Sequence, residues 1–330
     1  MQKKTGKGDK GSKDNKGNDG VFDVVGLGYT ATDYLSIVPH LPELDTKLEA
    51  TCLSIQGGGP VATGLVAVRR LGLSASYIGK VGGDGFGDFM LRELAKEDVD
   101  VSRVVRERGA TSQFAFIMVD GHSGKRTIVW TRGSVSKLKR GEADLGVIDT
   151  CKCLLLDDLE AEAGIEAATR ARASAVPIVL DAGALREGMR ELAAVCDFVV
   201  ASREFGKQYT GEVDPLFAAR KIYDETGRVS VVTMGAEGAV CVHSGGVIKQ
   251  EGFRVRAIDT TGAGDVFHGA FAVGILKGWE IPRVLEFSCA VAAMKCRSLG
   301  GRPGIPSFVE TIAFLRKESR ESWWGSEDAR

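Results

Sequence analysis

The chain has 330 residues, of which 26% are charged and 44% hydrophobic, and its formal net charge is −1. A nearly neutral chain lacks the field that would draw it to nucleic acid or to an anionic membrane, so we expect neither partner. Its length allows a large buried core, arranged as one large α/β domain or two ordinary ones. Its seven cysteines are scattered and odd in number, which favours a reducing compartment over a disulfide framework or structural zinc.

The first 20 residues contain lysine, glycine and aspartate but almost no apolar side chains. Such a segment cannot bury enough apolar surface to offset the entropy of ordering, so residues 1–20 are predicted to be a disordered tail. We expect a single folded domain over residues 21–330. No secretory or transit pattern occurs, and no apolar run is long enough for a membrane span, which predicts a cytoplasmic protein.

Short apolar or β-branched runs alternate with helical patterns along the rest of the chain. The predicted strands are Val21–Val25, Ala75–Gly79, Cys153–Leu156, Pro177–Leu180, Phe198–Val200, Val229–Thr233 and Ala239–Val242. The predicted helices are Val61–Leu71, Phe86–Glu97, Glu160–Ala173, Leu185–Ala194 and Pro215–Thr226. This alternation predicts an α/β fold with a doubly wound, mostly parallel sheet.

Two stretches depart from that alternation, at about residues 34–55 and 113–131. They show polar alternation, and the second contains the turn Asp120–Gly124, which is typical of hairpins. We expect these strands to form a small separate sheet that acts as a lid and excludes water during a transfer reaction. The alternative is that they extend the main sheet.

A glycine-rich run, Asp259–Asp265, follows the predicted strand Val255–Ile258 and precedes an apolar helical stretch. Gly262 and Gly264 let the backbone turn tightly, so the amides there and at Ala263 can point at an anion. The dipole of the following helix adds to this attraction. The pattern predicts a strand, a glycine turn and a helix N-terminus that binds phosphate.

Asp265 stands at the mouth of this predicted anion site, where its charge would repel a phosphate. Proton abstraction gives a reason for that placement. If a sugar hydroxyl lies between Asp265 and the γ-phosphate of ATP, the carboxylate takes its proton while the amides stabilise the transferring phosphoryl group. The alternative is that Asp265 only caps the helix.

The run Asp259–Asp265 resembles the C-terminal signature of the PfkB carbohydrate kinases, whose fold is ribokinase-like. The resemblance extends from Val21 to about Pro306 and includes Phe267–Phe271, Gly57–Gly64, Gly79–Gly87 and Val231–Gly238. It implies an enzyme that uses ATP and Mg²⁺ to phosphorylate a small-molecule sugar. By this resemblance Asp265 is the general base, and Gly262, Ala263 and Gly264 form the anion hole.

The same resemblance assigns further residues to the two ligands. It places the sugar hydroxyls against Asp33, Gly58 and Gly59, and the nucleotide near Thr233, Gly235 and Gly238. Asp157 and Asp158 end a predicted strand at the edge where α/β sheets bind ligands, so one of them is a substrate-binding candidate. Arg132 is a candidate for an anionic group on the substrate, or else a solvated surface arginine.

The chain departs from the family pattern at two places. The usual Asn-x-x-Glu motif is replaced by Ser202–Phe205, so Ser202 is a nucleotide-site candidate and Glu204 a candidate for holding Mg²⁺ through water. The asparagine that usually follows the double glycine is replaced by Ala62 or Thr63. Asp259 and Thr261 match part of the family's monovalent-cation site, which implies activation by K⁺.

The segments Phe287–Cys296 and Gly300–Gly304 resemble those of ketohexose and sulfofructose kinases. They favour a ketose-type acceptor, while ribose, a nucleoside and a 2-keto-3-deoxy sugar acid stay open. A homodimer formed through the lid is a further expectation. A non-catalytic, kinase-like regulatory protein is the alternative from another functional class.

A dinucleotide-binding enzyme is a weaker interpretation. Gly26–Ala31 matches a GxGxxA pattern after a strand, but that pattern should open a helix, and the following residues contain Pro39 and Pro42 with no helical period.

Overall fold

The computed structural model describes residues 21–319, 321 and 323–325, so the predicted tail at residues 1–20 lies outside the described residues. Within them, the main sheet has nine strands in the order β15-β14-β13-β12-β11-β10-β1-β4-β6. These are β1 (Val24–Leu27), β4 (Ala75–Ile78), β6 (Val99–Asp100), β10 (Cys153–Asp157), β11 (Ile178–Ala182), β12 (Phe198–Ser202), β13 (Val229–Thr233), β14 (Ala239–His243) and β15 (Gly246–Gln250). All pairs are parallel except β13–β14 and β14–β15.

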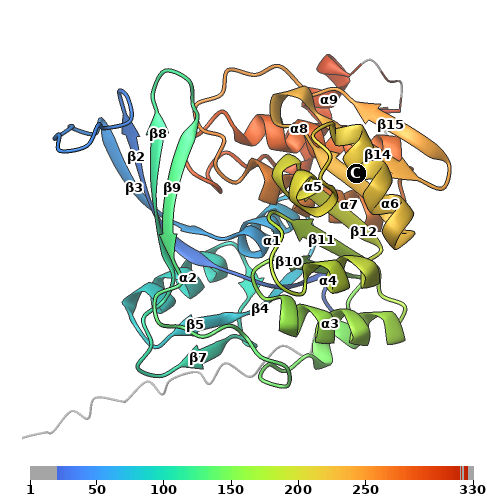
Figure 1. The fold of residues 1–330 in the computed structure, drawn as a ribbon, viewed down its shortest axis with the longest axis horizontal. Helices are drawn as coiled ribbons and strands as arrows, with labels where there is room; N and C mark the ends of the chain where they lie inside the picture. Colours follow the sequence, from blue (N-terminus) through green and yellow to red (C-terminus); the bar gives the residue numbers. More distant parts are fainter. Residues whose placement is uncertain (1–20, 320, 322, 326–330) are drawn as a thin grey trace, which may run out of the picture.

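Helices cover both faces of this sheet (Figure 1). One layer contains α1 (Pro60–Arg70), α7 (Ala263–Leu276), α8 (Ile281–Lys295) and α9 (Phe308–Glu318). The other contains α3 (Ala161–Ala173), α4 (Met189–Val195), α5 (Arg203–Thr210) and α6 (Pro215–Thr226). Successive strand residues alternate between the two cores, as Leu154 and Leu155 do, which explains why these strands are continuously apolar. In the described part of the chain, no helix is long and apolar enough to cross a bilayer.

A second sheet, which we call the lid, stands beside the body formed by the main sheet and its helices (Figure 1). Its strands, in the order β3-β2-β8-β9, are β2 (Ala31–Val38), β3 (Cys52–Gly58), β8 (Phe114–Asp120) and β9 (Arg126–Thr131). Helix α2 (Gly85–Lys96) packs against β2 and β3, and β5 (Lys80–Gly82) pairs with β7 (Val105–Glu107) nearby. The predicted doubly wound sheet with a small lid sheet is therefore confirmed.

Two predicted elements are wrong. Val255–Ile258 is not a strand, because the amide of Ile258 donates to the Cys296 carbonyl (2.8 Å) rather than to a neighbouring strand. The helix predicted to start at Leu185 starts at Met189, after Gly188 in the left-handed conformation (φ 81°). The preceding loop is held instead by Asp158, whose carboxylate accepts hydrogen bonds from the Ala184 amide and the Arg186 side chain, each 2.9 Å long.

Candidate functional site

The predicted anion hole lies at the start of α7, although no strand leads into it. Gly262 precedes the helix in the left-handed conformation (φ 73°), and a Cβ there would lie 2.8 Å from the Cα of Gly301, so only glycine fits. Gly264 is exposed, with open space where a Cβ would stand. The first amides of a helix have no intrahelical acceptor, so this turn fits the phosphate of ATP.

The Asp265 side chain stands in the first turn of α7 and is half-buried. Burial raises the pKa of its carboxyl above the usual value, while the positive charges of Arg126 and Lys295 lower it. A carboxylate with a raised pKa is a stronger base at neutral pH than an exposed one. The geometry and the electrostatics therefore suit Asp265 to the predicted role of base.

Asp33 lies on β2 of the lid, and its carboxylate covers Gly58 at the end of β3. A Cβ at Gly58 would lie 2.0 Å from Oδ2 of Asp33, so the close approach requires glycine. Burial raises the pKa of Asp33 to about 7, the charge of Arg302 opposes this, and the charges of Asp265 and Asp259 raise it further. The carboxylates of Asp33 and Asp265 are thus close enough to repel each other across the space between lid and body.

Gly59 also has a structural reason to be glycine. It precedes α1 with a φ of 93°, and a Cβ there would lie 2.5 Å from the carbonyl oxygen of Tyr29. A contact between Gly59 and a sugar stays a prediction.

Asp157 lies at the carboxyl end of β10, where the sequence analysis placed it, but its oxygens bind the protein backbone. Oδ2 accepts from the Tyr29 amide (2.7 Å) and Oδ1 from the Leu159 amide (3.0 Å). Burial raises the pKa of this carboxyl to about 7. Asp157 therefore fixes the loop after β1, and its contact with substrate stays a prediction.

Arg132 follows β9 and forms an ion pair with the buried Glu160, at 2.6 Å. Its guanidinium also lies over the Tyr29 ring, 5.2 Å from the ring centre, and Trp130 stands edge-on to the same ring at 5.9 Å. These contacts pin the end of β9 to the body. A substrate anion at Arg132 would have to share this guanidinium with Glu160.

The predicted nucleotide residues gather at the carboxyl ends of β12 and β13, where Ser202 and Thr233 are paired neighbours. Ser202 caps α5 by accepting a hydrogen bond from the Phe205 amide (2.9 Å). Gly235 has a φ of 62° with open space around its Cα, which leaves room for a ligand. Gly238 has a φ of 99°, and a Cβ there would lie 2.0 Å from the Gln250 carbonyl oxygen, so its glycine is required by the fold.

Few protein ligands are available for Mg²⁺. Glu204 is exposed in the first turn of α5 and accepts a hydrogen bond from Gln208 (2.9 Å). In the described ranges, no group of three or more His, Cys, Asp or Glu side chains is arranged to hold a metal ion. This fits Mg²⁺ that is bound mainly through phosphate oxygens and water, as is common for this ion.

The residues predicted to bind a monovalent cation, Asp259 and Thr261, are buried and linked by hydrogen bonds just before the anion hole. Oδ1 of Asp259 accepts from the amide and the hydroxyl of Thr261, and Oδ2 accepts from the Gly300 amide (2.7 Å). The ammonium of Lys295, itself fully buried, donates to the Asp259 carbonyl at 3.0 Å. A K⁺ ion held by the Asp259 carboxylate would therefore sit near a protein cation that bonds to the carbonyl of the same residue.

Sequence reasoning missed Arg126, Lys295 and Arg302, whose charges all act on Asp265. Arg126 opens β9 and donates to the Thr260 hydroxyl at 3.0 Å, which fastens the lid hairpin to the loop before the anion hole. No spacing pattern links these three residues to the glycine run. Only the fold brings them together.

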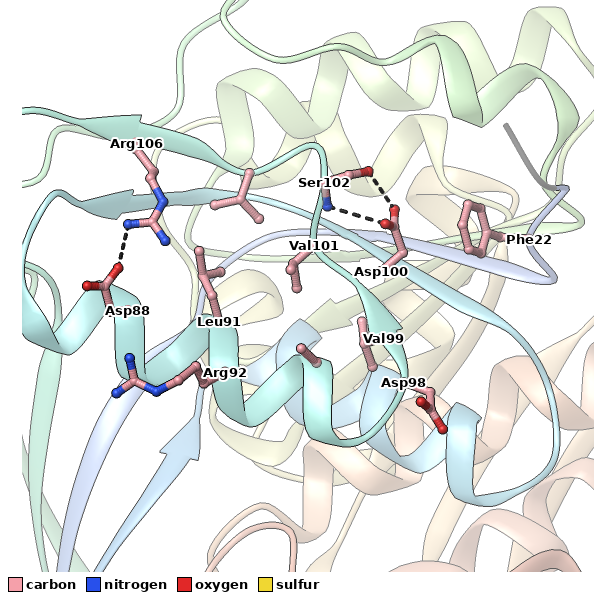
Figure 2. A pocket seen from close by; sticks show the side chains of 12 residues that line it. Phe22, Asp88, Leu91, Arg92, Asp98, Val99, Asp100, Val101, Ser102 and Arg106 are labelled. Carbon is pink, nitrogen blue, oxygen red and sulfur yellow. Dashed lines mark hydrogen bonds and ion pairs between the residues drawn. The ribbon is translucent and has the colours of Figure 1, made fainter. Parts of the chain in front are cut away.

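A separate groove of roughly 650 Å³ lies along α2 on the side of β6 and β7 (Figure 2). Leu91, Val99 and Val101 line it, and an ion pair between Arg106 and Asp88 (2.6 Å) lies at its rim. It contains none of the predicted site residues. The pair of carboxylates between lid and body, and not this groove, therefore defines the candidate active site.

A doubly wound sheet with a lid sheet and a glycine turn at a helix start is the arrangement predicted for a sugar kinase. The chain matches the family model described as "pfkB family carbohydrate kinase" over residues 22–307. It belongs to this family and is a carbohydrate kinase.

Similar proteins agree with this assignment. The chain is 29% identical to a ribokinase of Haemophilus influenzae, over 88% of this chain and 97% of that protein. It is similar to the crystal structure of a putative ribokinase from Agrobacterium tumefaciens (28% identity, TM-score 0.86, 90% and 98% covered). It shares its fold with a putative ribokinase II from E. coli, determined with ATP and Mg²⁺ (20% identity, TM-score 0.78, 90% and 100% covered).

The raised pKa of Asp33 predicts a pH-dependent cost in stability. Because the folded protein holds this proton up to about pH 7 and the unfolded chain only to about 3.8, the stability from this group falls as the pH rises between these values. Asp33→Asn does not carry this pH-dependent penalty. The difference in free energy of unfolding between Asp33→Asn and the wild type should therefore be more favourable to the variant at pH 8 than at pH 4.5, by about 3 kcal/mol.

Urea unfolding at both pH values measures the difference. Asp224→Asn, at an exposed position on α6, is the matched control and should follow the wild type. An Asp33→Asn variant that follows the wild type at both pH values would contradict the assigned burial of this charge.

Proposed function

We propose that the protein transfers the γ-phosphate of ATP to a hydroxyl of a ketose-type sugar or sugar derivative, with Asp265 as the general base. The observation that carries this proposal is the pairing of two carboxylates from different parts of the fold. Asp33 lies on the lid and Asp265 at the start of α7, and the charge of Asp265 helps to raise the pKa of Asp33. One carboxylate can hold acceptor hydroxyls there while the other faces the phosphate site.

Each group has a separate task in this scheme. Asp33 accepts hydrogen bonds from sugar hydroxyls, and the bare backbone at Gly58 and Gly59 lets the sugar approach. Asp265 takes the proton of the reacting hydroxyl. The amides around Gly262, Ala263 and Gly264 stabilise charge on the phosphoryl group, and the lid excludes water that would otherwise compete.

ATP supplies the phosphoryl group, and we place it along the carboxyl ends of β12 and β13, near Ser202, Thr233, Gly235 and Gly238. Mg²⁺ would be held by the phosphates and by water, with Glu204 as an outer contact. The open space at Gly235 and at Gly264 supports this placement, since a ligand could approach the backbone at each of these glycines.

The identity of the sugar that accepts the phosphoryl group is the most specific part of the proposal. The resemblance of Phe287–Cys296 and Gly300–Gly304 to ketohexose and sulfofructose kinases favours a ketose, and the similar protein named ribokinase makes ribose the main competitor. A nucleoside or a 2-keto-3-deoxy sugar acid is the next candidate, and Arg132 and Asp157 would be near such a substrate. A non-catalytic regulatory protein is disfavoured by the retained Asp265 and the glycine turn.

Asp265→Asn tests the base. We expect its kcat to fall by roughly 10²–10⁴ because the hydroxyl keeps its proton, while its affinity for ATP is retained because a charge that repels phosphate is removed. ADP release across a panel of ketoses, ribose, nucleosides and 2-keto-3-deoxy acids identifies the acceptor, and calorimetry measures ATP binding. Asp224→Asn is the control. ATP binding without turnover of any acceptor by the wild type would favour the regulatory alternative.

Activation by K⁺, through Asp259 and Thr261, is a further proposal. Replacing K⁺ by choline should lower kcat several-fold if the ion orders the loop before the anion hole. The buried Lys295 ammonium already bonds to the Asp259 carbonyl. Equal rates in KCl and choline chloride would therefore overturn the proposal and assign the cation's task to Lys295.

We also propose a homodimer through the outer face of the lid. The side chains of Ile55, Tyr34, Phe116 and Val129 form one row across its four strands, and Phe116 and Val129 are 52% and 59% exposed. Such an apolar row is typical of an interaction surface. Sedimentation should show a dimer that Phe116→Glu converts to a monomer, whereas Val213→Glu, at an exposed site on the body, should leave it intact. A monomeric wild type would contradict this.

A further inference from the structure

Arg302 is a buried arginine whose hydrogen bonds are incomplete. Arg302 comes directly after Gly300 and Gly301 in the sequence, and only 5% of its surface is exposed. Nη2 donates to the carbonyl of Gly58 at 3.1 Å. In the described part of the chain, Nε and Nη1 have no hydrogen-bond partner. A buried guanidinium with unpaired donors is expensive to retain, which indicates a task other than stability.

The guanidinium lies against Gly57 and Gly58, which we call the double glycine here; of this pair, Gly58 is a predicted sugar contact. A Cβ at Gly57 would stand 2.3 Å from Nη1 of Arg302, and a Cβ at Gly58 would stand 2.0 Å from Oδ2 of Asp33. The missing side chain at Gly57 therefore leaves room for the Arg302 guanidinium, and the one at Gly58 leaves room for the Asp33 carboxylate. The backbone of Gly57 and Gly58 runs between a guanidinium and a carboxylate, and any side chain at either position would push one of them away.

Without Arg302, the charged groups that act on the Asp33 carboxyl would all be acidic. The acidic groups that act on Asp33 are Asp265 and Asp259, and Arg302 is the cation that offsets them. The phenol of Tyr29 also feels the Asp33 charge. Burial lowers the pKa of Arg302 to about 10, so the guanidinium still carries its charge at neutral pH.

A different arginine holds the Arg302 loop in place. Nη1 of Arg70 donates to the carbonyl of Arg302 at 2.8 Å, and its Nη2 pairs with Glu97 at 2.6 Å. The fixing of the loop and the charge facing Asp33 therefore belong to different side chains. This separation makes Arg70 a control for the structural part of any effect.

We propose that Arg302 is a positioning residue of the acceptor site, which fixes the Gly58 carbonyl and faces Asp33 with its positive charge through the double glycine. The inference rests on the proposed function, because it takes Asp33 as the group that binds the sugar. Arg302 acts through Asp33 and Gly58 and does not contact the reacting atoms. Its loss should weaken acceptor binding and leave the chemistry at Asp265 and the ATP site nearly intact.

The test compares Arg302→Gln, Arg302→Lys and Arg70→Gln, with the acceptor that the panel identifies. For Arg302→Gln we expect the acceptor KM to rise about tenfold, since a nearby opposite charge shifts a carboxyl pKa by about one unit or more. Both the KM for ATP and kcat should change less than threefold. Without the guanidinium the pKa of Asp33 rises, so the acidic limb of acceptor kcat/KM should move to higher pH by about one unit.

The controls separate charge from structure. Arg302→Lys keeps the charge and should recover most of the KM, whereas Arg70→Gln should lower the melting temperature without moving the pH limb. A pH limb that stays in place in Arg302→Gln, or a kcat that falls with an unchanged acceptor KM, would overturn the inference while leaving the proposed function intact. A wild type that phosphorylates no acceptor would instead remove the proposed function.

Discussion

The burial of the Asp33 carboxyl near the charge of Asp265 is the constraint on which this site depends. Burial raises the pKa of both carboxyls, and the charge of Asp265 raises the pKa of Asp33 further. Positive charges from separate elements favour the charged form of Asp265, namely those of Arg126 on the lid, Lys295 on α8 and Arg302 beside Gly57. The dipole at the start of α7 acts in the same direction. A neutral hydroxyl fits between the carboxylates, because it donates to either of them.

The same constraint explains why the site spans two sheets. Asp33 is carried by the lid, and Asp265 is carried by the body. A ligand that contacts both carboxylates would therefore contact both the lid and the body. The hydrogen bond from Arg126 to Thr260 and the ion pair of Arg132 with Glu160 join the lid to the body. A sugar bound between the carboxylates would add to these contacts and favour closure.

Local patterns predicted most of the fold. Buried parallel strands such as Cys153–Asp157 are continuous apolar runs, and Gly262 marks the start of the predicted anion hole because its left-handed conformation requires glycine. The strand predicted at Val255–Ile258 was wrong because its backbone bonds to a distant carbonyl, that of Cys296, which no local pattern reveals. Arg302 was missed for the same reason: 244 residues separate it from Gly58. Asp157 was placed at the correct sheet edge, but its Oδ2 is occupied by the amide of Tyr29, 128 residues away, which no local pattern reveals.

A crystal structure with a non-hydrolysable ATP analogue and the acceptor found by the panel would test the central claim most directly. The account predicts one sugar hydroxyl between the Asp265 carboxylate and the γ-phosphate, with the γ-phosphate on the amides at the start of α7. Other hydroxyls of the same sugar should lie on Asp33. A sugar that contacts neither carboxylate, or a γ-phosphate bound away from Gly262–Gly264, would contradict it.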